Sequence, residues 1–183
     1  MLVSFNILKK LIIKLPTIRP KQLDEILTMS VVEVESVVDQ AQRLEKTVVG
    51  VVEKVAKHPN ADKLKLATVN IGNKSQDVVC GGVNLRVGMK VAFARVGALV
   101  KWHGEREFTP LESATIRGVK SNGMACSAAE LGLIDDNEPE HGIMDLSYLK
   151  AKPGTSLSEA LGKNDLIIEI DNKSITHRPD LWG

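Results

Sequence analysis

Two stretches of the chain contain side chains that could bind a phosphate. Residues 57–65 surround a His-Pro-Asn-Ala-Asp turn with Lys57, Lys63 and Lys65. Residues 116–132 end a predicted strand and open a predicted helix, and they contain Arg117 and two serines, Ser121 and Ser127. Cationic side chains, hydroxyls and the free backbone N–H groups of a helix start are donors that bind phosphate oxygens. Both stretches therefore predict contacts to a phosphate-bearing ligand.

The sequence shows no pattern typical of a catalytic or metal site. It lacks the Gly-Lys-Ser/Thr phosphate loop, the Gly-x-Gly-x-x-Gly fingerprint and the Gly-x-Ser-x-Gly elbow. An acidic loop at 135–140 is interpreted as solvated surface, and Cys126 beside Ser127 as a buried thiol rather than a nucleophile. Cys80 and Cys126 are the only cysteines, so we expect two reduced, buried thiols. The four histidines lack metal-ligand spacing, and no metal is expected.

Charge is distributed unevenly although the net charge is only +1. Residues 1–40 hold five basic and five acidic side chains. Residues 41–130 hold fourteen basic and eight acidic ones, and residues 131–183 hold five basic and ten acidic ones. A basic middle segment between neutral and acidic flanks is typical of a surface that faces a polyanion. An ordinary solvated surface is the alternative. The six aromatic residues are too few for an extended base-stacking platform, so any nucleic-acid contact must depend on charge and shape.

Hydrophobic periodicity predicts the elements that position these residues. Residues 4–15 form an amphipathic pattern behind Ser4, a good N-cap, and a second helix is expected to begin at Pro20. A strand is expected at 31–38. Short strands separated by turn residues follow at 48–56, 64–71, 77–80, 90–94 and 114–118. Short helices are expected at 127–131, where Gly132 would cap, and at 156–161, and a last strand at 166–170.

Five strands without intervening helices fit a small Greek-key barrel, the oligonucleotide-binding (OB) fold. The terminal segments are each too short to bury a core alone, so we expect them to pair with one another. The predicted fold class is α+β: a five-stranded OB-fold β-barrel inserted into a small split α/β domain. The predicted boundaries are 1–40 and 151–183 for the two halves of the split domain, with the barrel at 41–150.

The amino terminus carries lysines within its apolar stretch and has no cleavage site, and no apolar run is long enough to span a membrane. We therefore expect a cytoplasmic protein with no membrane partner. The sequence stops at Leu181-Trp182-Gly183 without a helix cap or a polar tail. This ending suggests that the natural chain continues.

The two phosphate-binding stretches resemble the signature of the EMAP II-like tRNA-binding OB domain. The matching strings are His-Pro-Asn-Ala-Asp-Lys-Leu at 58–64 and Arg-Gly-Val-Lys-Ser-Asn-Gly-Met-Ala-Cys-Ser-Ala-Ala-Glu-Leu-Gly at 117–132. A middle string at 79–88 is also similar, although Gly82 and Val83 stand where Ala-Pro is commoner. The resemblance implies tRNA binding by nine residues of these strings: Lys57, Asn60, Lys63, Lys65, Arg86, Arg117, Lys120, Ser121 and Ser127.

The flanking segments narrow the resemblance to the opening of the bacterial phenylalanine-tRNA ligase beta subunit. The segments that carry it are 3–10, 27–35 and 171–180. Three positions depart from that family: Ile7 stands where Trp is usual, Val31 where Gly is usual, and His177 where Asn is common. We interpret the first as the exchange of one core side chain for another. Essentially all 183 residues are covered by the resemblance.

The resemblance implies a supporting role in ATP-dependent aminoacylation. The whole enzyme would be an alpha2-beta2 tetramer that joins phenylalanine to tRNA-Phe with ATP and Mg²⁺, and its synthetic site would lie in the alpha subunit. This segment would bind tRNA or assist subunit assembly, with no catalytic residue, no metal and no cofactor of its own. Two alternatives stay open, a free-standing tRNA-binding OB-fold protein and a purely structural assembly module.

Overall fold

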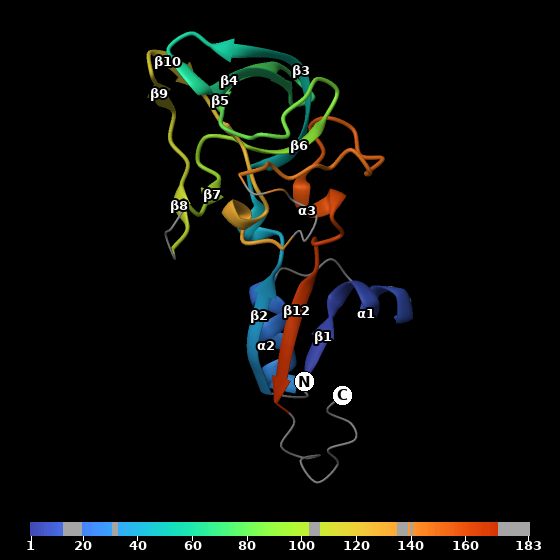
Figure 1. The fold of residues 1–183 in the computed structure, drawn as a ribbon. Helices are drawn as coiled ribbons and strands as arrows, with labels where there is room; N and C mark the ends of the chain where they lie inside the picture. Colours follow the sequence, from blue (N-terminus) through green and yellow to red (C-terminus); the bar gives the residue numbers. More distant parts are fainter. Residues whose placement is uncertain (13–19, 31–32, 103–106, 135–138, 140, 172–183) are drawn as a thin grey trace. The chain divides into compact units, whose positions relative to one another are not determined.

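The structure is a computed structural model of the chain that describes residues 1–12, 20–30, 33–102, 107–134, 139 and 141–171. It is mostly β-structure with a few short helices (Figure 1). The chain forms two compact units. One unit comprises Met1–Gln42 and Gly162–Gly183, and the other is Arg43–Leu161.

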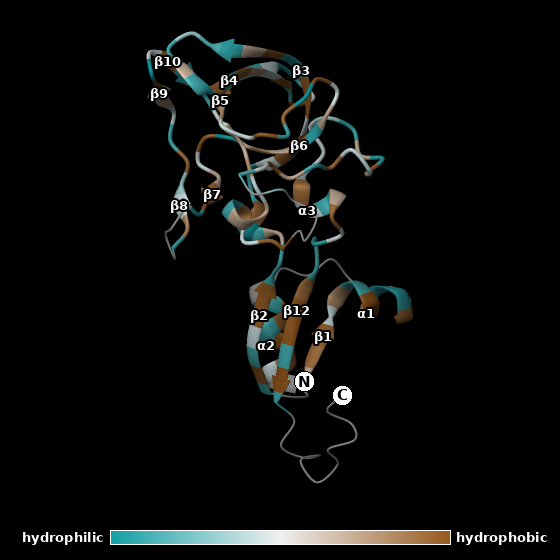
Figure 2. Cartoon of the chain, viewed as in Figure 1, coloured by the Kyte–Doolittle hydropathy of each residue, from teal (hydrophilic) through white to brown (hydrophobic). Residues whose placement is uncertain are grey.

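The unit formed by the two ends of the sequence contains a three-stranded antiparallel sheet. Its strands are β1 (Leu2–Ser4), β12 (Leu166–Asp171) and β2 (Glu33–Asp39), in the order β1-β12-β2. Strand β12 is mostly hydrophobic in Figure 2, in keeping with a core that contains Ile168 and Ile170, whereas β2 mixes hydrophobic and hydrophilic residues. The central strand is thus the last one in sequence, and it pairs with strands from the first forty residues.

The two longer helices of the chain belong to this unit. They are α1 (Phe5–Leu11) and α2 (Pro20–Ser30). Ser4 caps α1 as predicted, because its hydroxyl oxygen accepts a hydrogen bond from the Ile7 N–H at 3.1 Å. The expected extension of this helix to residue 15 falls partly on 13–19, outside the described residues. The interpretation of Ile7 as a core side chain is wrong, since it is 57% exposed.

The larger unit is built on a five-stranded antiparallel sheet in the order β11-β6-β3-β4-β5. Its strands are β3 (Thr47–His58), β4 (Ala61–Asn70), β5 (Ser75–Cys80), β6 (Lys90–Ala94) and β11 (Met124–Ala125). Valines dominate the inward positions of these strands, and Phe93 is the largest fully buried side chain among the described residues. β-Branched and aromatic residues fit such a half-buried pleated surface, which explains why the sequence patterns predicted four of these strands closely.

The remaining elements of the larger unit are short. They are two hairpins, β7 (Leu99–Val100) with β8 (Thr109–Pro110) and β9 (Ala114–Ile116) with β10 (Val119–Ser121), the 3₁₀ helices η1 (Gln42–Leu44) and η2 (Ala129–Leu131), and α3 (Leu157–Ala160). The predicted strand at 114–118 is confirmed only over Ala114–Ile116, and it is not part of the five-stranded sheet. The chain reverses at Arg117 and Gly118, whose φ angles are 50° and 89°, so the fifth strand of the sheet is β11.

The predicted closed barrel is corrected to an OB-like sheet that stays open between β5 and β11. Among the described residues no backbone ladder joins these two edges, and we call this gap the seam. Side chains bridge it: the Val79 N–H donates to Ser121 Oγ at 3.1 Å, and Gln76 Nε2 donates to the Asn122 carbonyl. The Ser121 hydroxyl donates in turn to the Gly123 carbonyl at 3.0 Å. A buried hydroxyl thus takes the place of a strand-to-strand hydrogen bond.

None of the described helices has the length and apolar character needed to cross a membrane.

We expect Ser121→Ala to destabilise the larger unit. The substitution leaves the buried Val79 N–H without an acceptor, at a cost of about 1 to 3 kcal/mol in the free energy of unfolding. Urea unfolding would measure this change in the free energy of unfolding. Thr115→Ala, which removes an exposed hydroxyl from the same hairpin, should change the free energy by less than about 0.5 kcal/mol. Equal effects of the two variants would contradict the bridging role.

Candidate nucleic-acid interface

Hydrogen bonds join the two predicted phosphate-binding stretches at their turns. His58 Nε2 lies 3.2 Å from the Ile116 carbonyl, and Asn60 Nδ2 donates to the Arg117 carbonyl at 3.1 Å. His58 Nδ1 accepts from the Asn60 N–H at 3.1 Å, so Nε2 carries the proton in this arrangement. The β3–β4 turn and the β9–β10 turn, far apart in the sequence, therefore form one surface of the larger unit (Figure 1).

Arg117 occupies a strained position at the tip of this surface. The β9–β10 connection is a two-residue turn with positive φ at both Arg117 and Gly118, a geometry that favours Asn-Gly. An arginine in the left-handed region costs about 1 to 2 kcal/mol relative to its preferred conformations. The Asn60 side chain holds the strained peptide in place through its hydrogen bond to the Arg117 carbonyl. The backbone at Arg117 is thus held in place, and the Arg117 side chain is exposed to solvent.

Three lysines are exposed on the strands that lead into these turns. Lys57 and Lys63 lie on β3 and β4, and Lys120 lies on β10 opposite Thr115. Among the described residues, none of the three forms an ion pair. Lys57 is paired in register with Lys65, a juxtaposition of like charges that is unfavourable unless an anion lies nearby. We call Lys57, Lys63, Arg117 and Lys120 the turn cluster.

Lys65 differs from the turn cluster because its ammonium group binds backbone carbonyls of the protein itself. The residue is half-buried, and its ammonium group donates to the carbonyls of Gly82 and Val83, at 3.3 and 3.2 Å. Lys65 therefore holds the loop after β5 against β4. The two residues it contacts are the ones that depart from the Ala-Pro pattern of the resemblance.

The two predicted serine contacts also have partners inside the protein. Ser121 is buried and bridges the seam, so its hydroxyl does not reach a surface ligand. Ser127 and Glu130 form a capping box: the Ser127 N–H donates to Glu130 Oε2 at 2.7 Å, and the Glu130 N–H donates to Ser127 Oγ at 3.2 Å. The predicted helix at 127–131 is a single 3₁₀ turn, which Gly132 caps as expected with φ 62°. These N–H groups are therefore not free to hold a phosphate.

Arg86 lies on the loop between β5 and β6 and, of the predicted contacts, is the one that pairs with a carboxylate among the described residues. Its Nη2 atom is 2.6 Å from Asp145 Oδ2, while 57% of its side chain stays exposed. Partial burial alone would raise the pKa of the Asp145 carboxyl, but hydrogen bonds from Ser147 and Arg86 outweigh it and hold that pKa below its ordinary value.

A groove of about 620 Å³ opens at the Cys80 end of the seam. Its lining includes Lys63, Cys80, Gly82, Ser127, Glu130 and His141. Burial raises the pKa of the Cys80 thiol, so this cysteine is a neutral thiol at physiological pH. Sequence reasoning missed Glu130 and His141 as neighbours of Lys63. The Ser-x-x-Glu spacing could have indicated Glu130, whereas His141 has no local signal.

Cys80 and Cys126 are both buried, as predicted, and no disulfide joins them. Within the part of the chain that the structure describes, no cluster of three or more His, Cys, Asp or Glu side chains could hold a metal ion. The arrangement offers cations, carbonyls and amides for binding. Cys126 is fully buried.

Residues 47–155 match the protein-family model described as "Putative tRNA binding domain". The chain belongs to this tRNA-binding domain family. It is also 43% identical over 158 residues to the phenylalanine–tRNA ligase beta subunit of Leptospira borgpetersenii, covering 86% of this chain and 19% of that protein. It shares 36% identity over 184 residues with the same subunit of Oceanobacillus iheyensis, covering 98% of this chain and 22% of that protein.

The chain is thus homologous to the amino-terminal fifth of the bacterial beta subunit, which confirms the resemblance predicted from the sequence. It spans about a fifth of the length of these curated relatives. Among solved structures, a protein of Pyrococcus horikoshii titled "MetRS related protein" aligns with a TM-score of 0.42 and 22% identity, over 61% of this chain and 87% of that one. The assignment rests on the family match and the sequence relatives.

We expect Asn60→Ala to loosen the joined turns. The variant loses the hydrogen bond to the Arg117 carbonyl, which should cost about 0.5 to 1.5 kcal/mol and speed amide exchange in the β9–β10 hairpin. NMR-detected hydrogen exchange would measure this. Asn164→Ala removes an exposed amide of the other unit and should leave the hairpin unchanged. Unchanged exchange in the Asn60 variant would show that the turns hold together without it.

The lowered pKa of Asp145 predicts a small pH dependence of stability. The carboxylate stabilises the folded state at neutral pH, and this contribution is lost as the pH falls below about 4 towards the lowered folded-state value. Because the ion pair is exposed, it should amount to less than about 1 kcal/mol. Urea unfolding of Asp145→Asn between neutral and acidic pH should show a correspondingly flatter profile. An identical profile for the two proteins would contradict the assignment.

Proposed function

We propose that this chain contacts tRNA through the turn cluster, as the tRNA-binding part of a phenylalanine–tRNA ligase beta subunit. The observation that carries the proposal is the joining of two basic stretches into one exposed surface by the bonds of His58 and Asn60. The tRNA-binding domain family to which residues 47–155 belong supports it. So does the strain at Arg117, because a position that favours asparagine carries a cation instead.

The expected mode of binding is electrostatic and directed at the RNA backbone. Lysine and arginine side chains on an exposed surface displace counterions from phosphates, so the affinity should be modest and should fall steeply with salt. Few aromatic side chains are available for stacking on bases. The contact should therefore discriminate poorly among tRNA sequences, and selection of tRNA-Phe would depend on other parts of the enzyme.

We extend the proposal to the whole enzyme on the strength of the relatives. The full protein would be the beta subunit of an alpha2-beta2 phenylalanine–tRNA ligase that uses ATP and Mg²⁺ in the cytoplasm. This segment would supply no catalytic residue, and the alpha subunit would hold the synthetic site. In fold terms the open sheet would correspond to an OB barrel inserted into a split α/β domain, with boundaries at 40 and 150.

An assembly role is the second candidate, and a specific observation favours it. Polar residues of the signature strings, among them His58, Asn60, Ser121 and Ser127, have hydrogen-bond partners inside the protein. Those residues account for the signature through fold geometry without any ligand. A free-standing tRNA-binding protein is a third candidate, and the length of the natural reading frame would decide it.

A titration with tRNA at low and moderate salt separates the first two candidates. Lys63→Glu should weaken binding several-fold for any tRNA and lower the salt slope by about one unit. Arg117→Asn separates the effect of charge from that of stability, because asparagine relieves the backbone strain while the positive charge is removed. It should weaken binding without lowering the free energy of unfolding.

Lys152→Glu reverses an exposed charge outside the turn cluster and serves as the control. It should bind tRNA almost as the unmodified chain does. Undetectable binding of the unmodified chain at low salt would refute the tRNA contact and favour the assembly role. Equal weakening by all three variants would indicate attraction to net charge alone and would contradict a localised interface.

A further inference from the structure

A second basic hollow lies at the other end of β4 from the turn cluster. It encloses about 480 Å³ beside the β4–β5 turn and the end of β6, and its lining residues are Asn73, Lys74, Gln76, Arg95, Val96 and Asn122. Two of these six are cations, three carry side-chain amides and none is acidic. The hollow opens where Gln76 and Asn122 bridge the seam, away from the groove at Cys80. None of these residues was predicted as a site.

Arg95 carries a guanidinium that the protein only partly satisfies. The side chain is half-buried, and its Nε atom is buried without a hydrogen-bond partner. Its side-chain hydrogen bond is a long one, from Nη2 to the Ile71 carbonyl at 3.5 Å. Among the described residues no carboxylate pairs with it. A half-buried cation without a carboxylate partner is costly, and an anion bound to the accessible part of the guanidinium would offset that cost.

The β4–β5 turn holds Lys74 beside the hollow. Asn70 Oδ1 accepts a hydrogen bond from the Gly72 N–H at 2.9 Å, and the Ile71 N–H donates to the Lys74 carbonyl at 2.9 Å. Gly72 has φ 95° and packs so closely on the 153–154 turn that a Cβ would lie 2.7 Å from the Pro153 carbonyl oxygen. The turn is thus fixed on both sides, and the Lys74 ammonium stays exposed.

The carboxylate that reaches this turn does not neutralise these cations. Glu53 accepts hydrogen bonds from Asn70 Nδ2 at 3.0 Å and Ser75 Oγ at 2.7 Å, and it does not line the hollow. The Arg95 N–H donates to the Lys46 carbonyl at 3.0 Å, which fixes the backbone at Arg95, and Lys46 does not line the hollow either. The hollow therefore combines a positive potential with N–H donors from guanidinium and amide groups.

We propose that the Lys74–Arg95 hollow binds a phosphate group. A planar guanidinium offers paired N–H donors that match two phosphate oxygens, and the ammonium and amide groups can take the others. The phosphate is carried either by an RNA backbone or by a small phosphate compound. The inference rests on this geometry alone and does not require that the turn cluster bind tRNA.

Inorganic phosphate titrated into the 183-residue chain, at constant ionic strength, tests the proposal. The readout is the NMR signal of the Arg95 side-chain Nε–H, which should shift and saturate on the order of 1 to 10 mM phosphate. Arg95→Gln removes the reporter, so its effect is read at the backbone amides of Lys74 and Val96. Arg95→Gln and Lys74→Gln should each raise the half-saturation at least about tenfold. Lys150→Gln, an exposed lysine outside the hollow, should not change it.

A second titration with a short single-stranded RNA distinguishes the two sources of phosphate. If RNA shifts the same signals at lower concentration than phosphate does, and phosphate competes with it, the RNA backbone is the natural carrier. If phosphate shifts them and RNA does not, the site takes a small phosphate compound. No saturable shift with either ligand overturns the proposal, as does an unchanged half-saturation in folded Arg95→Gln and Lys74→Gln variants. Because the readout is local, these outcomes are independent of tRNA binding at the turn cluster.

Discussion

An antiparallel sheet that does not close leaves two edges whose backbone groups need partners, and this constraint organises the larger unit. The edges are β5 and β11, and the protein meets the need with side chains. Ser121 accepts from the Val79 N–H and Gln76 donates to the Asn122 carbonyl. Because these bonds fix only the middle of the seam, hollows remain on either side of them, one beside Cys80 and one beside Arg95.

The same constraint separates the polar residues of the signature strings into two groups. His58, Asn60, Ser121 and Ser127 face the protein and replace backbone hydrogen bonds at turns and edges. Lys57, Lys63, Arg117 and Lys120 face solvent, and nothing described in the protein neutralises them. The inward group holds the turns in place, and the outward group gives the surface its charge. The contact we propose would therefore weaken if either group were lost, although for different physical reasons.

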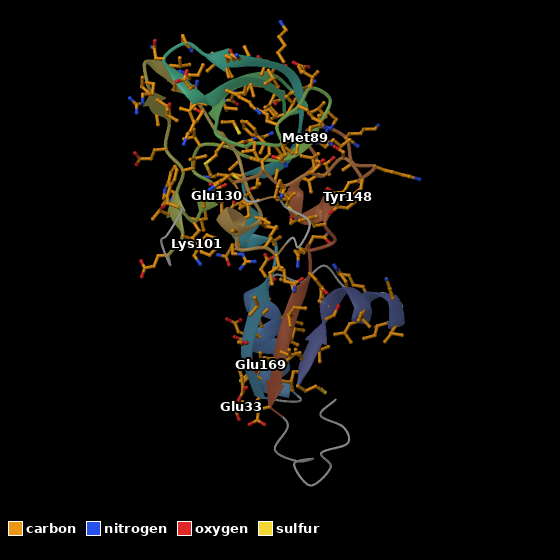
Figure 3. The ribbon with its side chains drawn as sticks, in the orientation of Figure 1. Glu33, Met89, Lys101, Glu130, Tyr148 and Glu169 are labelled. Carbon is orange, nitrogen blue, oxygen red and sulfur yellow. The ribbon has the colours of Figure 1, made fainter. Side chains whose placement is uncertain are left out.

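Charged side chains labelled in Figure 3 lie in both units. Glu130, which completes the capping box, and Lys101 lie in the larger unit, whereas Glu33 and Glu169 lie on the sheet of the smaller unit. Basic residues outnumber acidic ones between 41 and 130 and are outnumbered after 131. An anionic ligand would for this reason be attracted to the segment 41–130, nearly all of which lies in the larger unit. This agrees with the position of the tRNA-binding family match, at 47–155.

The sequence alone determined the strands β3, β4, β5 and β6, the capped start of α1 and the identity of the basic stretches, because hydrophobic period, turn residues and cap residues act over a few positions. Only the tertiary structure decided that β11 replaces the 114–118 segment as fifth strand, that the sheet stays open, and that Ser121 and Ser127 are used internally. It also brought Lys74 and Arg95 to one hollow. These features depend on contacts between residues distant in sequence, and a local pattern carries no information about which partner a donor or a strand edge will meet.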